Sequence, residues 1–230
     1  MEKAGIGLVI FAKNEEKTIG DLIDRAVSYI PRTDIFVMDG HSGDRTASIV
    51  RHMGISLLSD ERPGKGAAIR QAIRNIDRDI LIFMDGDGSH QPEEIPNFIR
   101  IFKEDPEIQL VVGSRFKGGS EELNGSPGEL MRLAGNKLGT ALINLRWRAG
   151  LSDVQNGFRA IRRRTAHELM LSENSFAIEQ EMIMKCLKKK KRIAEFPSWE
   201  RKRLHNQSHV IPSKMILPYT RSLLKDMLRR

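Results

Sequence analysis

Two acidic segments, each directly after an apolar run, carry the residues best suited to chemistry in this chain. Asp39 follows the apolar residues 35–38, and Asp85 and Asp87 follow the apolar residues 80–84. In an open α/β sheet, ligands lie beyond the carboxyl ends of the strands. Two carboxylates spaced two residues apart can bind one hard cation, Mg²⁺ or Mn²⁺, which can bridge a nucleotide diphosphate. The segments therefore predict an enzyme for a nucleotide-activated substrate, with Asp85 and Asp87 as metal ligands.

The length and composition indicate one large globular domain with a substantial core. The chain has 230 residues, of which 40% are hydrophobic and 30% charged. Its one cysteine, Cys186, excludes a disulfide framework, and no Cys/His cluster has zinc spacing. The chain reaches a strand-like segment at Ile6, which leaves no room for a secretory signal, and no apolar stretch approaches the roughly 20 residues of a membrane span. We expect a cytoplasmic, reducing environment.

The net charge of +8 indicates anionic partners such as phosphates or acidic lipids. Much of this charge lies in three basic blocks, within residues 185–192, 201–203 and 221–230. A solvated surface explains any single block equally well, but the three together favour a surface that faces phosphate or the cytoplasmic face of a membrane. A nucleic-acid binder would also be basic, yet the strand-end carboxylates would repel its phosphates unless a metal intervened. We therefore expect no nucleic-acid partner.

The first 115 residues alternate between strand and helix. Strands are predicted over residues 6–12, 35–39, 55–58 and 110–114, with another ending at Asp85. Between them, apolar residues repeat at helical spacing. Regular alternation of this kind predicts an α/β fold in which a mainly parallel sheet is flanked by helices on both faces.

The second half is less regular. Residues 117–128 are polar and rich in glycine, which is typical of a linker or of a mobile loop beside an active site. Helices are predicted over residues 129–145 and 178–187, with a strand or turn over 154–161.

The C-terminal residues 212–230 form a basic amphipathic tail, separate from a catalytic domain over residues 1–211. Apolar residues lie near one face of a predicted helix, with basic residues between them and an early interruption at Pro218. Such a helix can dock on its own domain, lie on a membrane surface or contact another subunit.

Five segments stand at the ends of predicted strands or at the start of a predicted helix. They are residues 11–16, 37–46, 64–68, 85–93 and 153–160. Their sequences and order resemble the motifs of the family 2 glycosyltransferases with a GT-A fold, particularly the polyprenyl-phosphate (dolichyl-phosphate) mannose and glucose synthases. The resemblance spans residues 5–210 and implies a GT-A, Rossmann-like fold for a nucleotide-diphospho-sugar transferase.

The resemblance implies a site for the nucleotide base at the ends of the first two strands. It assigns Ala12, Asn14, Glu15 and Asp39 to this site. Simpler roles are open for the two carboxylates: Asp39 could cap its own turn, and Glu15 could be an ordinary carboxylate at a helix N-terminus.

The phosphates of the donor need basic partners. Lys65 lies between two glycines that favour close backbone approach to a ligand, although a solvated lysine is the alternative. Arg115 and Arg203 are suited to bidentate phosphate recognition. Arg203 and Ser208 match the synthases' Arg-x-x-Gly-x-Ser-Lys segment, in which His209 replaces the lysine.

The acceptor decides whether a general base is needed. A lipid monophosphate is already anionic and nucleophilic at neutral pH, whereas a hydroxyl acceptor needs a base, for which Asp153 is the best candidate. With a lipid phosphate, Asp153 would position donor or acceptor instead. Arg159 either binds the acceptor phosphate or pairs with Glu179 or Glu181.

The resemblance implies an inverting transfer of a hexose from a nucleotide-diphosphate sugar to a polyprenyl (dolichyl) phosphate, with Mg²⁺ or Mn²⁺ as cofactor. The donor would be of the GDP-mannose or UDP-glucose class. The catalytic residues would be Asp87, Asp153 and Arg203. The alternative is a family 2 glycosyltransferase that uses a soluble hydroxyl acceptor, such as a glycan or a glycerate derivative.

Overall fold

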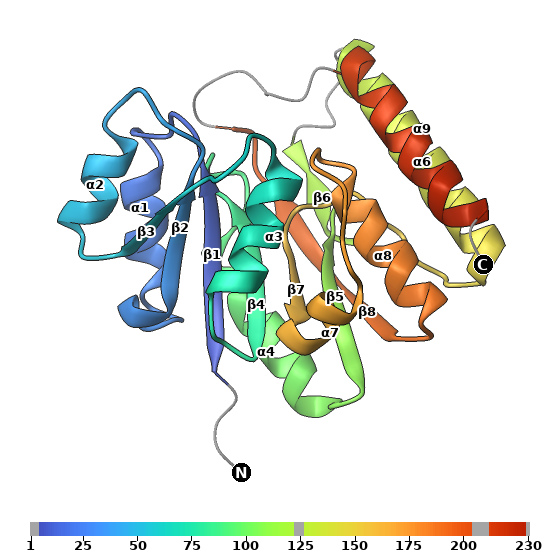
Figure 1. The fold of residues 1–230 in the computed structure, drawn as a ribbon, viewed down its shortest axis with the longest axis horizontal. Coiled ribbons are helices and arrows are strands. Elements are labelled where there is room, and N and C mark those ends of the chain that lie inside the picture. The colour runs from blue at the N-terminus through green and yellow to red at the C-terminus, as the bar shows by residue number, and fades with distance from the viewer. Residues whose placement is uncertain (1–4, 122–126, 204–211, 229–230) are drawn as a thin grey trace.

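A mixed sheet collects the carboxyl ends of its parallel strands at one edge. The computed structural model describes residues 5–121, 127–203 and 212–228. Its strands are β1 (Ile6–Ala12), β2 (Ile35–Asp39), β3 (Ser56–Ser59), β4 (Ile80–Asp85), β5 (Ile108–Ser114), β6 (Gly119–Ser120), β7 (Arg159–Arg162) and β8 (Arg192–Glu200). The described strands form one eight-stranded sheet in the order β3-β2-β1-β4-β7-β5-β8-β6 (Figure 1). Only β7 runs antiparallel to its neighbours in this sheet, so the expected mainly parallel sheet is confirmed.

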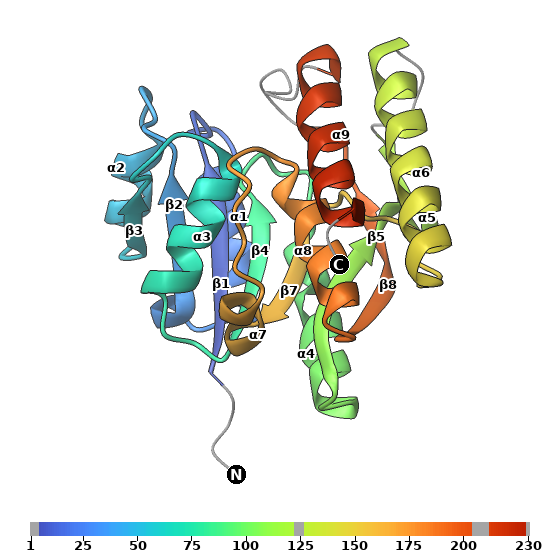
Figure 2. The same cartoon turned by 45° about the vertical axis from the view of Figure 1, so that its right-hand side comes forward.

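Helices cover both faces of the sheet, as the alternating pattern predicts. They are α1 (Ile19–Ala26), α2 (Thr46–His52), α3 (Lys65–Asn75), α4 (Ile95–Glu104), α5 (Arg115–Gly118), α6 (Pro127–Trp147), α7 (Arg163–Glu168), α8 (Ile178–Lys188) and α9 (Pro212–Leu228). Side chains of α1 and α4 pack in one core layer, and those of α3, α7 and α8 pack in the other. Figure 2 shows α3 and α7 in front of the sheet.

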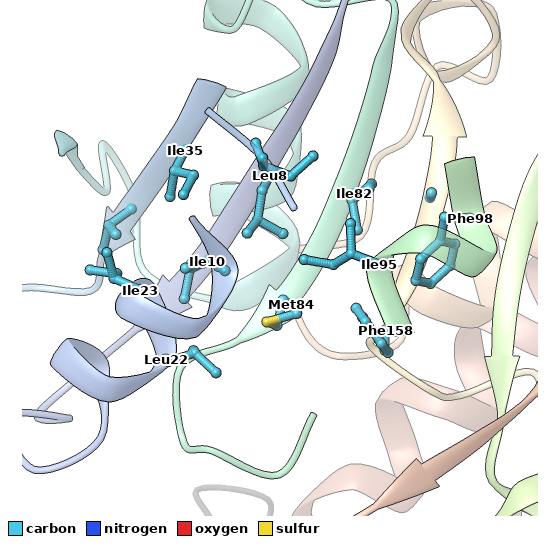
Figure 3. Packing of buried hydrophobic residues seen from close by; sticks show 14 of the residues in the cluster. Leu8, Ile10, Leu22, Ile23, Ile35, Ile82, Met84, Ile95, Phe98 and Phe158 are labelled. Carbon is cyan, nitrogen blue, oxygen red and sulfur yellow. The ribbon is translucent and has the colours of Figure 1, made fainter. Parts of the chain in front are cut away.

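Alternation along the strands divides the core between the two faces. In β1, Leu8 and Ile10 belong to the layer under α1 and α4, whereas Val9 belongs to the opposite layer. Figure 3 shows the first layer, in which Leu22 of α1 and Phe98 of α4 are packed near the sheet. This packing fixes β1 and β4, whose carboxyl ends carry the predicted site residues.

Helices α6 and α9 contact each other and α8. Both extend past the carboxyl-end edge of the sheet (Figures 1 and 2). Among the described residues, we find no helix with the length and apolar character needed to cross a bilayer.

The structure departs from the sequence prediction in the second half. Strand β8 lies in the sheet between β5 and β6, where no strand was predicted. The predicted interruption of the last helix at Pro218 is wrong, since α9 continues through that residue. Contacts of α9 with α6 and α8 offset the backbone hydrogen bond that a proline removes.

Within the segment 117–128, the residues of β6 pair with β8. Residues 122–126 lie outside the described residues, as do residues 204–211, which would carry the boundary between the catalytic domain and the tail. That boundary stays a prediction.

Candidate active site

Lys65, the first residue of α3, binds Asp85 at the end of β4. Its Nζ lies 2.7 Å from Oδ1 and 2.9 Å from Oδ2 of Asp85, and 2.8 Å from Oε1 of Glu179 in α8. Burial alone disfavours the charged amine, but the two carboxylates outweigh burial and raise the pKa of Lys65. Burial would raise the pKa of Asp85, and Lys65 reverses this and lowers it. Lys65 is therefore a buried ion-pair residue and not a solvated lysine.

Glycines make room for this cluster. A Cβ atom on Gly157 would lie 2.6 Å from Nζ of Lys65 and 3.0 Å from Oδ2 of Asp85. The expectation that Gly64 and Gly66 approach a ligand needs correction. A Cβ on either residue would lie 2.3 Å from a backbone oxygen of residues 173–174, so these glycines allow α3 to pack against that loop.

Asp87, the second candidate metal ligand, pairs with Arg203 beyond the end of β8. Nε of Arg203 lies 3.1 Å from Oδ2 of Asp87. The other oxygen, Oδ1, accepts hydrogen bonds from the backbone N–H and the hydroxyl of Ser89, at 3.0 and 2.6 Å. The backbone N–H of Arg201 donates to the carbonyl of Ser89 at 2.9 Å, which joins the end of β8 to the acidic loop. Ser208 and His209 lie outside the described residues.

His90 supports the loop that carries Asp85 and Asp87. Its Nδ1 accepts the backbone N–H of Asp85 at 3.1 Å, which assigns the ring proton to Nε2. Nε2 lies 3.2 Å from Oδ1 of Asn156, and the ring stacks on Phe158 with centroids 5.0 Å apart. His90 thus orients the backbone of Asp85.

Arg115, which directly follows β5, and Asp153 form a bidentate ion pair. Nε and one terminal nitrogen of Arg115 lie 2.7 and 3.0 Å from the two oxygens of Asp153. Asn136 donates to Oδ1 of Asp153 at 2.9 Å, and Glu200 lies 3.4 Å from Arg115. Burial of Asp153 would raise its pKa, but Arg115 lowers it, and the side chain is fully buried. This arrangement favours a positioning role for Asp153 over that of a general base.

A cavity of about 350 Å³ is lined by members of these ion pairs. Its charged side chains include Lys65, Asp85, Arg115, Glu179, Glu200 and Arg203. Its apolar side chains come from α6 (Met131, Leu133, Leu138 and Leu142), α9 (Leu223) and two phenylalanines, Phe116 and Phe176. Tyr219 of α9 also lines it, so the C-terminal helix forms part of the wall.

The four residues assigned to the nucleotide base lie together at the ends of β1 and β2. Ala12 and Asp39 are register partners, and the carbonyl of Ala12 accepts the N–H of Gly40 at 2.8 Å. Asn14 has a positive φ of 59°, and its Oδ1 accepts the N–H of Gly43 at 2.7 Å. Asp39 accepts the hydroxyl of Ser42 at 2.5 Å, which is the turn-capping contact that the sequence left open.

Glu15 and Asp60 also lie beyond the carboxyl ends of strands, Glu15 after β1 and Asp60 after β3. Glu15 is buried, and its backbone N–H donates to the hydroxyl of Thr46 at 2.8 Å. Asp60, which the sequence did not single out, follows β3, and its backbone N–H donates to the carbonyl of Asp39 at 3.1 Å. Burial and, more weakly, the charge of Asp39 raise the pKa of Asp60 from 3.8 to about 6.

Arg159 does not reach the cavity. Its guanidinium is fully buried and donates to the backbone carbonyls of Val154, Asn156 and Glu179. Burial lowers its pKa. Arg159 therefore fixes the loop between Asp153 and β7 and does not reach a position to bind an acceptor phosphate. Of its two expected structural partners, Glu179 and Glu181, it contacts Glu179, through a hydrogen bond to the backbone carbonyl.

The donor set at the end of β4 fits a divalent cation. Asp85 and Asp87 offer carboxylate oxygens, which hard cations prefer, and Mg²⁺ commonly takes one or two carboxylates with substrate phosphates and water. No cluster of three or more His, Cys, Asp or Glu suited to a metal occurs within residues 5–121, 127–203 and 212–228. The site therefore fits a cation that a diphosphate completes, and not an all-protein metal cage.

Comparison with known proteins identifies relatives along most of the chain. The model of glycosyl transferase family 2 matches residues 8–170. The chain is 29% identical to the dolichyl-phosphate hexose transferase of Haloferax volcanii, with 84% of this chain and 81% of that protein covered. It is 26% identical to the undecaprenyl-phosphate mannosyltransferase of Micrococcus luteus, with 82% of this chain and 80% of that protein covered. The resemblance inferred from the motifs is confirmed.

Solved structures show the same fold. Glucosyl-3-phosphoglycerate synthase of Mycobacterium tuberculosis superposes with a TM-score of 0.73 and 24% identity, over 97% of this chain and 81% of that one. Its complex with Mn²⁺, UDP-glucose and glycerol 3-phosphate gives a TM-score of 0.75, also at 24% identity, over 97% of this chain and 80% of that one. The likeness confirms the GT-A fold.

Proposed function

The chain belongs to glycosyl transferase family 2, and we propose that it transfers a hexose from a nucleotide-diphosphate sugar to a polyprenyl phosphate, with inversion and with a divalent cation. Glycosyl transfer itself follows from the family. The donor, the acceptor and the dependence on Mg²⁺ or Mn²⁺ are the proposal. Curated relatives named as dolichyl-phosphate hexose transferase and undecaprenyl-phosphate mannosyltransferase support this acceptor class.

The observation that carries the proposal is the mixed chemistry of the cavity. Its lining combines basic groups, those of Lys65, Arg115 and Arg203, and the carboxylates of Asp85, Glu179 and Glu200 with apolar side chains of α6 and α9. A polyprenyl phosphate is mixed in a matching way, because an anionic head is joined to a hydrocarbon chain. A small polar acceptor would leave the apolar wall without a partner, and buried apolar contact is the main source of affinity for a hydrocarbon chain.

The donor would lie along the carboxyl ends of β1, β2 and β4. In this pose Asp39 and Glu15 face the base and ribose, and Asp85 and Asp87 hold the cation. When bound, the cation neutralises charge on the departing diphosphate. Lys65 and Arg203, both paired with these carboxylates, would add charge-assisted hydrogen bonds to the diphosphate.

The acceptor phosphate would enter from the side of α6 and α9. Arg115 lines the cavity and is held in a fixed orientation by Asp153 and Glu200. A guanidinium fixed in this way can orient a phosphate so that one oxygen faces the anomeric carbon opposite the leaving group. Attack from that side inverts the configuration.

No proton needs to be removed from an anionic acceptor, and the ion pairs agree with this. Among the described residues that line the cavity, the carboxylates of Asp85 and Glu179 pair with Lys65, and that of Glu200 pairs with Arg115. A carboxylate that accepts from a cation is a poor base, since its negative charge is already stabilised.

The second candidate is transfer to a soluble hydroxyl acceptor, such as a glycan or a glycerate derivative. Glu179 favours it, because its carboxylate lines the cavity beside Asp85 and would act as base if Lys65 moved away. The solved structures of glucosyl-3-phosphoglycerate synthase share the fold, and at 24% identity they carry no acceptor assignment.

We also propose that the exposed faces of α6 and α9 contact the membrane that contains the lipid acceptor. Leu138 and Leu145 of α6 are 63% and 81% exposed, and Leu217 and Leu224 of α9 are 75% and 52% exposed. Apolar side chains on basic amphipathic helices are typical of binding to an anionic bilayer surface. Because these helices also line the cavity, a lipid chain would reach it without leaving an apolar path.

The experiment is an acceptor assay with the purified full-length chain. A thermal-shift screen of GDP-, UDP- and other nucleotide sugars with Mn²⁺ first selects the donor. Transfer is then measured to dolichyl phosphate and undecaprenyl phosphate in detergent, and to 3-phosphoglycerate and simple sugars in water. Transfer to a polyprenyl phosphate is the expected result. Turnover on a soluble alcohol without transfer to any polyprenyl phosphate would establish the second candidate instead.

A further inference from the structure

Lys65 contacts both carboxylate oxygens of Asp85, the oxygens that a divalent cation would use. Its Nζ lies within 2.9 Å of both carboxylate oxygens. A cation that binds Asp85 would therefore share at least one carboxylate oxygen with the ammonium or displace the ammonium from it. Two positive charges at one carboxylate repel each other, and the repulsion is strong where water is largely excluded.

Glu179 offers the displaced ammonium a partner that is already in contact. Oε1 of Glu179 lies 2.8 Å from Nζ, and the side chains of Lys65 and Glu179 are only 8% and 4% exposed. The Cα of Gly157 closes another side of the cluster, since even a methyl group there would lie 2.6 Å from Nζ. Lys65 thus has a short path from Asp85 to Glu179 and little room elsewhere.

We propose that Glu179 is a positioning residue that sets the cation affinity of the site by holding Lys65 when the cation takes Asp85. This inference rests on the metal site proposed above. In the cation-free site Lys65 is shared between Asp85 and Glu179. With a cation on Asp85 it would stay on Glu179, and its charge would stabilise the donor diphosphate. Lys65 is then both a competitor of the cation and a ligand of the nucleotide.

The two roles predict opposite effects of one substitution. Lys65→Met removes the competitor, so Mn²⁺ should bind the nucleotide-free protein about tenfold more tightly. The same variant loses a diphosphate contact, so the nucleotide should bind more weakly when Mn²⁺ is saturating. A lysine that only holds the fold together would move neither constant in this pattern.

Glu179→Gln should act in the other direction. The ammonium then has only the Asp85 carboxylate as a full negative partner, and Mn²⁺ should bind about tenfold more weakly. In a Lys65→Met background there is no ammonium to hold, so the effect of Glu179→Gln should largely disappear. That non-additivity separates an action through Lys65 from a general loss of negative charge.

The test is a Mn²⁺ titration followed by electron paramagnetic resonance, with nucleoside diphosphate binding followed by calorimetry. Four proteins are compared: wild type, the two single variants and the double variant, whose charge balance matches that of the wild type. Glu181→Gln is the matched control, because Glu181 lies on the same helix, is equally buried and pairs with Lys185. Its Mn²⁺ affinity should equal that of the wild type.

Several results would overturn the proposal. They are an unchanged Mn²⁺ affinity in Lys65→Met, equal effects of Glu179→Gln with and without Lys65, or a wild-type protein that binds no Mn²⁺ with or without nucleotide. Thermal unfolding of each variant establishes that it is folded. If Lys65→Met does not fold, the Mn²⁺ affinity of the double variant, compared with that of Glu179→Gln, tests whether removal of the ammonium restores cation binding. None of these measurements requires an acceptor, so failure of transfer to lipid would leave their outcome intact.

Discussion

Replacing Asp153 with asparagine should destabilise the protein before it affects any chemical step. The carboxylate is fully buried, and its oxygens accept from Nε and a terminal nitrogen of Arg115 at 2.7 and 3.0 Å. It also accepts from Asn136 at 2.9 Å and from the backbone N–H of Gln155 at 3.1 Å. In Asp153→Asn an amide NH₂ replaces one oxygen, so a donor must face either the guanidinium or another donor.

The expected loss follows from the burial of both charges. Breaking a buried ion pair by removing one partner typically costs about 3–5 kcal/mol, because the remaining charge is left uncompensated. Glu200 reduces the loss only partly, since its oxygen lies 3.4 Å from Arg115. For a chain of this size 1 kcal/mol corresponds to about 2–4 °C, so the midpoint of thermal unfolding should fall by roughly 6–20 °C.

Calorimetry at neutral pH measures this loss, with Glu200→Gln as the control that removes the longer contact and should cost about 1–2 kcal/mol. Arg115 lowers the pKa of Asp153, so the stabilisation is present above the unfolded-state pKa of about 3.9 and is lost as the pH falls through the folded-state value. The gap between wild type and Asp153→Asn should therefore close in acid. A variant that unfolds at the wild-type temperature but loses kcat on a hydroxyl acceptor would refute this reasoning and make Asp153 the base.

Three further substitutions test other parts of the site. Asp87→Asn should abolish transfer and weaken cation-dependent nucleotide binding, while the circular dichroism spectrum stays unchanged. Full activity of this variant would contradict the assignment of Asp87 as a metal ligand. Gly157→Ala should lower kcat/KM about tenfold or more and also lower the midpoint of thermal unfolding, because its methyl group displaces Nζ of Lys65 from a buried ion pair; normal kinetics would show that the cluster adapts. Asp60→Asn should stabilise the protein at pH 7 and remove a loss of stability that develops in the wild type as the pH rises from about 4 to 6. The raised pKa of Asp60, about 6, means that the folded state holds the proton more tightly there, and identical pH–stability curves would contradict it.

The part of the sheet that contains β1, β2 and β4 could be predicted closely from sequence. Strands β1 and β2 begin and end where the apolar runs begin and end, and β4 ends at Asp85. Each of these strands is buried on both faces, so its sequence is a continuous apolar run bounded by polar residues. The strand-end rule then places Asp39 and Asp85 at one edge, as observed.

Strand β8 was missed for a physical reason. Pro197 lies inside it and is a register partner of Ser114, although proline usually argues against a strand within a sheet. The basic block before it suggests a solvated surface. Charged residues inside β8 are nevertheless satisfied: Glu195 accepts the backbone N–H groups of Ser152 and Asp153, so a residue that is unfavourable for a buried strand serves to hold the loop that carries Asp153.

The ion pairs of the site could not be read from sequence. Lys65 and Glu179 are 114 positions apart, and no spacing or composition signal links them. The sequence suggests Glu179 only as a partner for Arg159, whose guanidinium instead donates to backbone carbonyls, including that of Glu179. Such pairings arise only when α3 and α8 pack on the same face of the sheet.

The position of β7 explains how one sheet can serve two substrates. It is the strand that runs antiparallel between β4 and β5, so it separates the parallel β3-β2-β1-β4 half from the β5-β8-β6 half. Asp85 projects from the first half and Arg115 from the second, and both line the same cavity. An inverting displacement needs the nucleophile and the leaving group on opposite sides of one carbon. A donor held by the first half and an acceptor held by the second would meet in that geometry, which is why the acceptor should be sought on the side of α6 and α9.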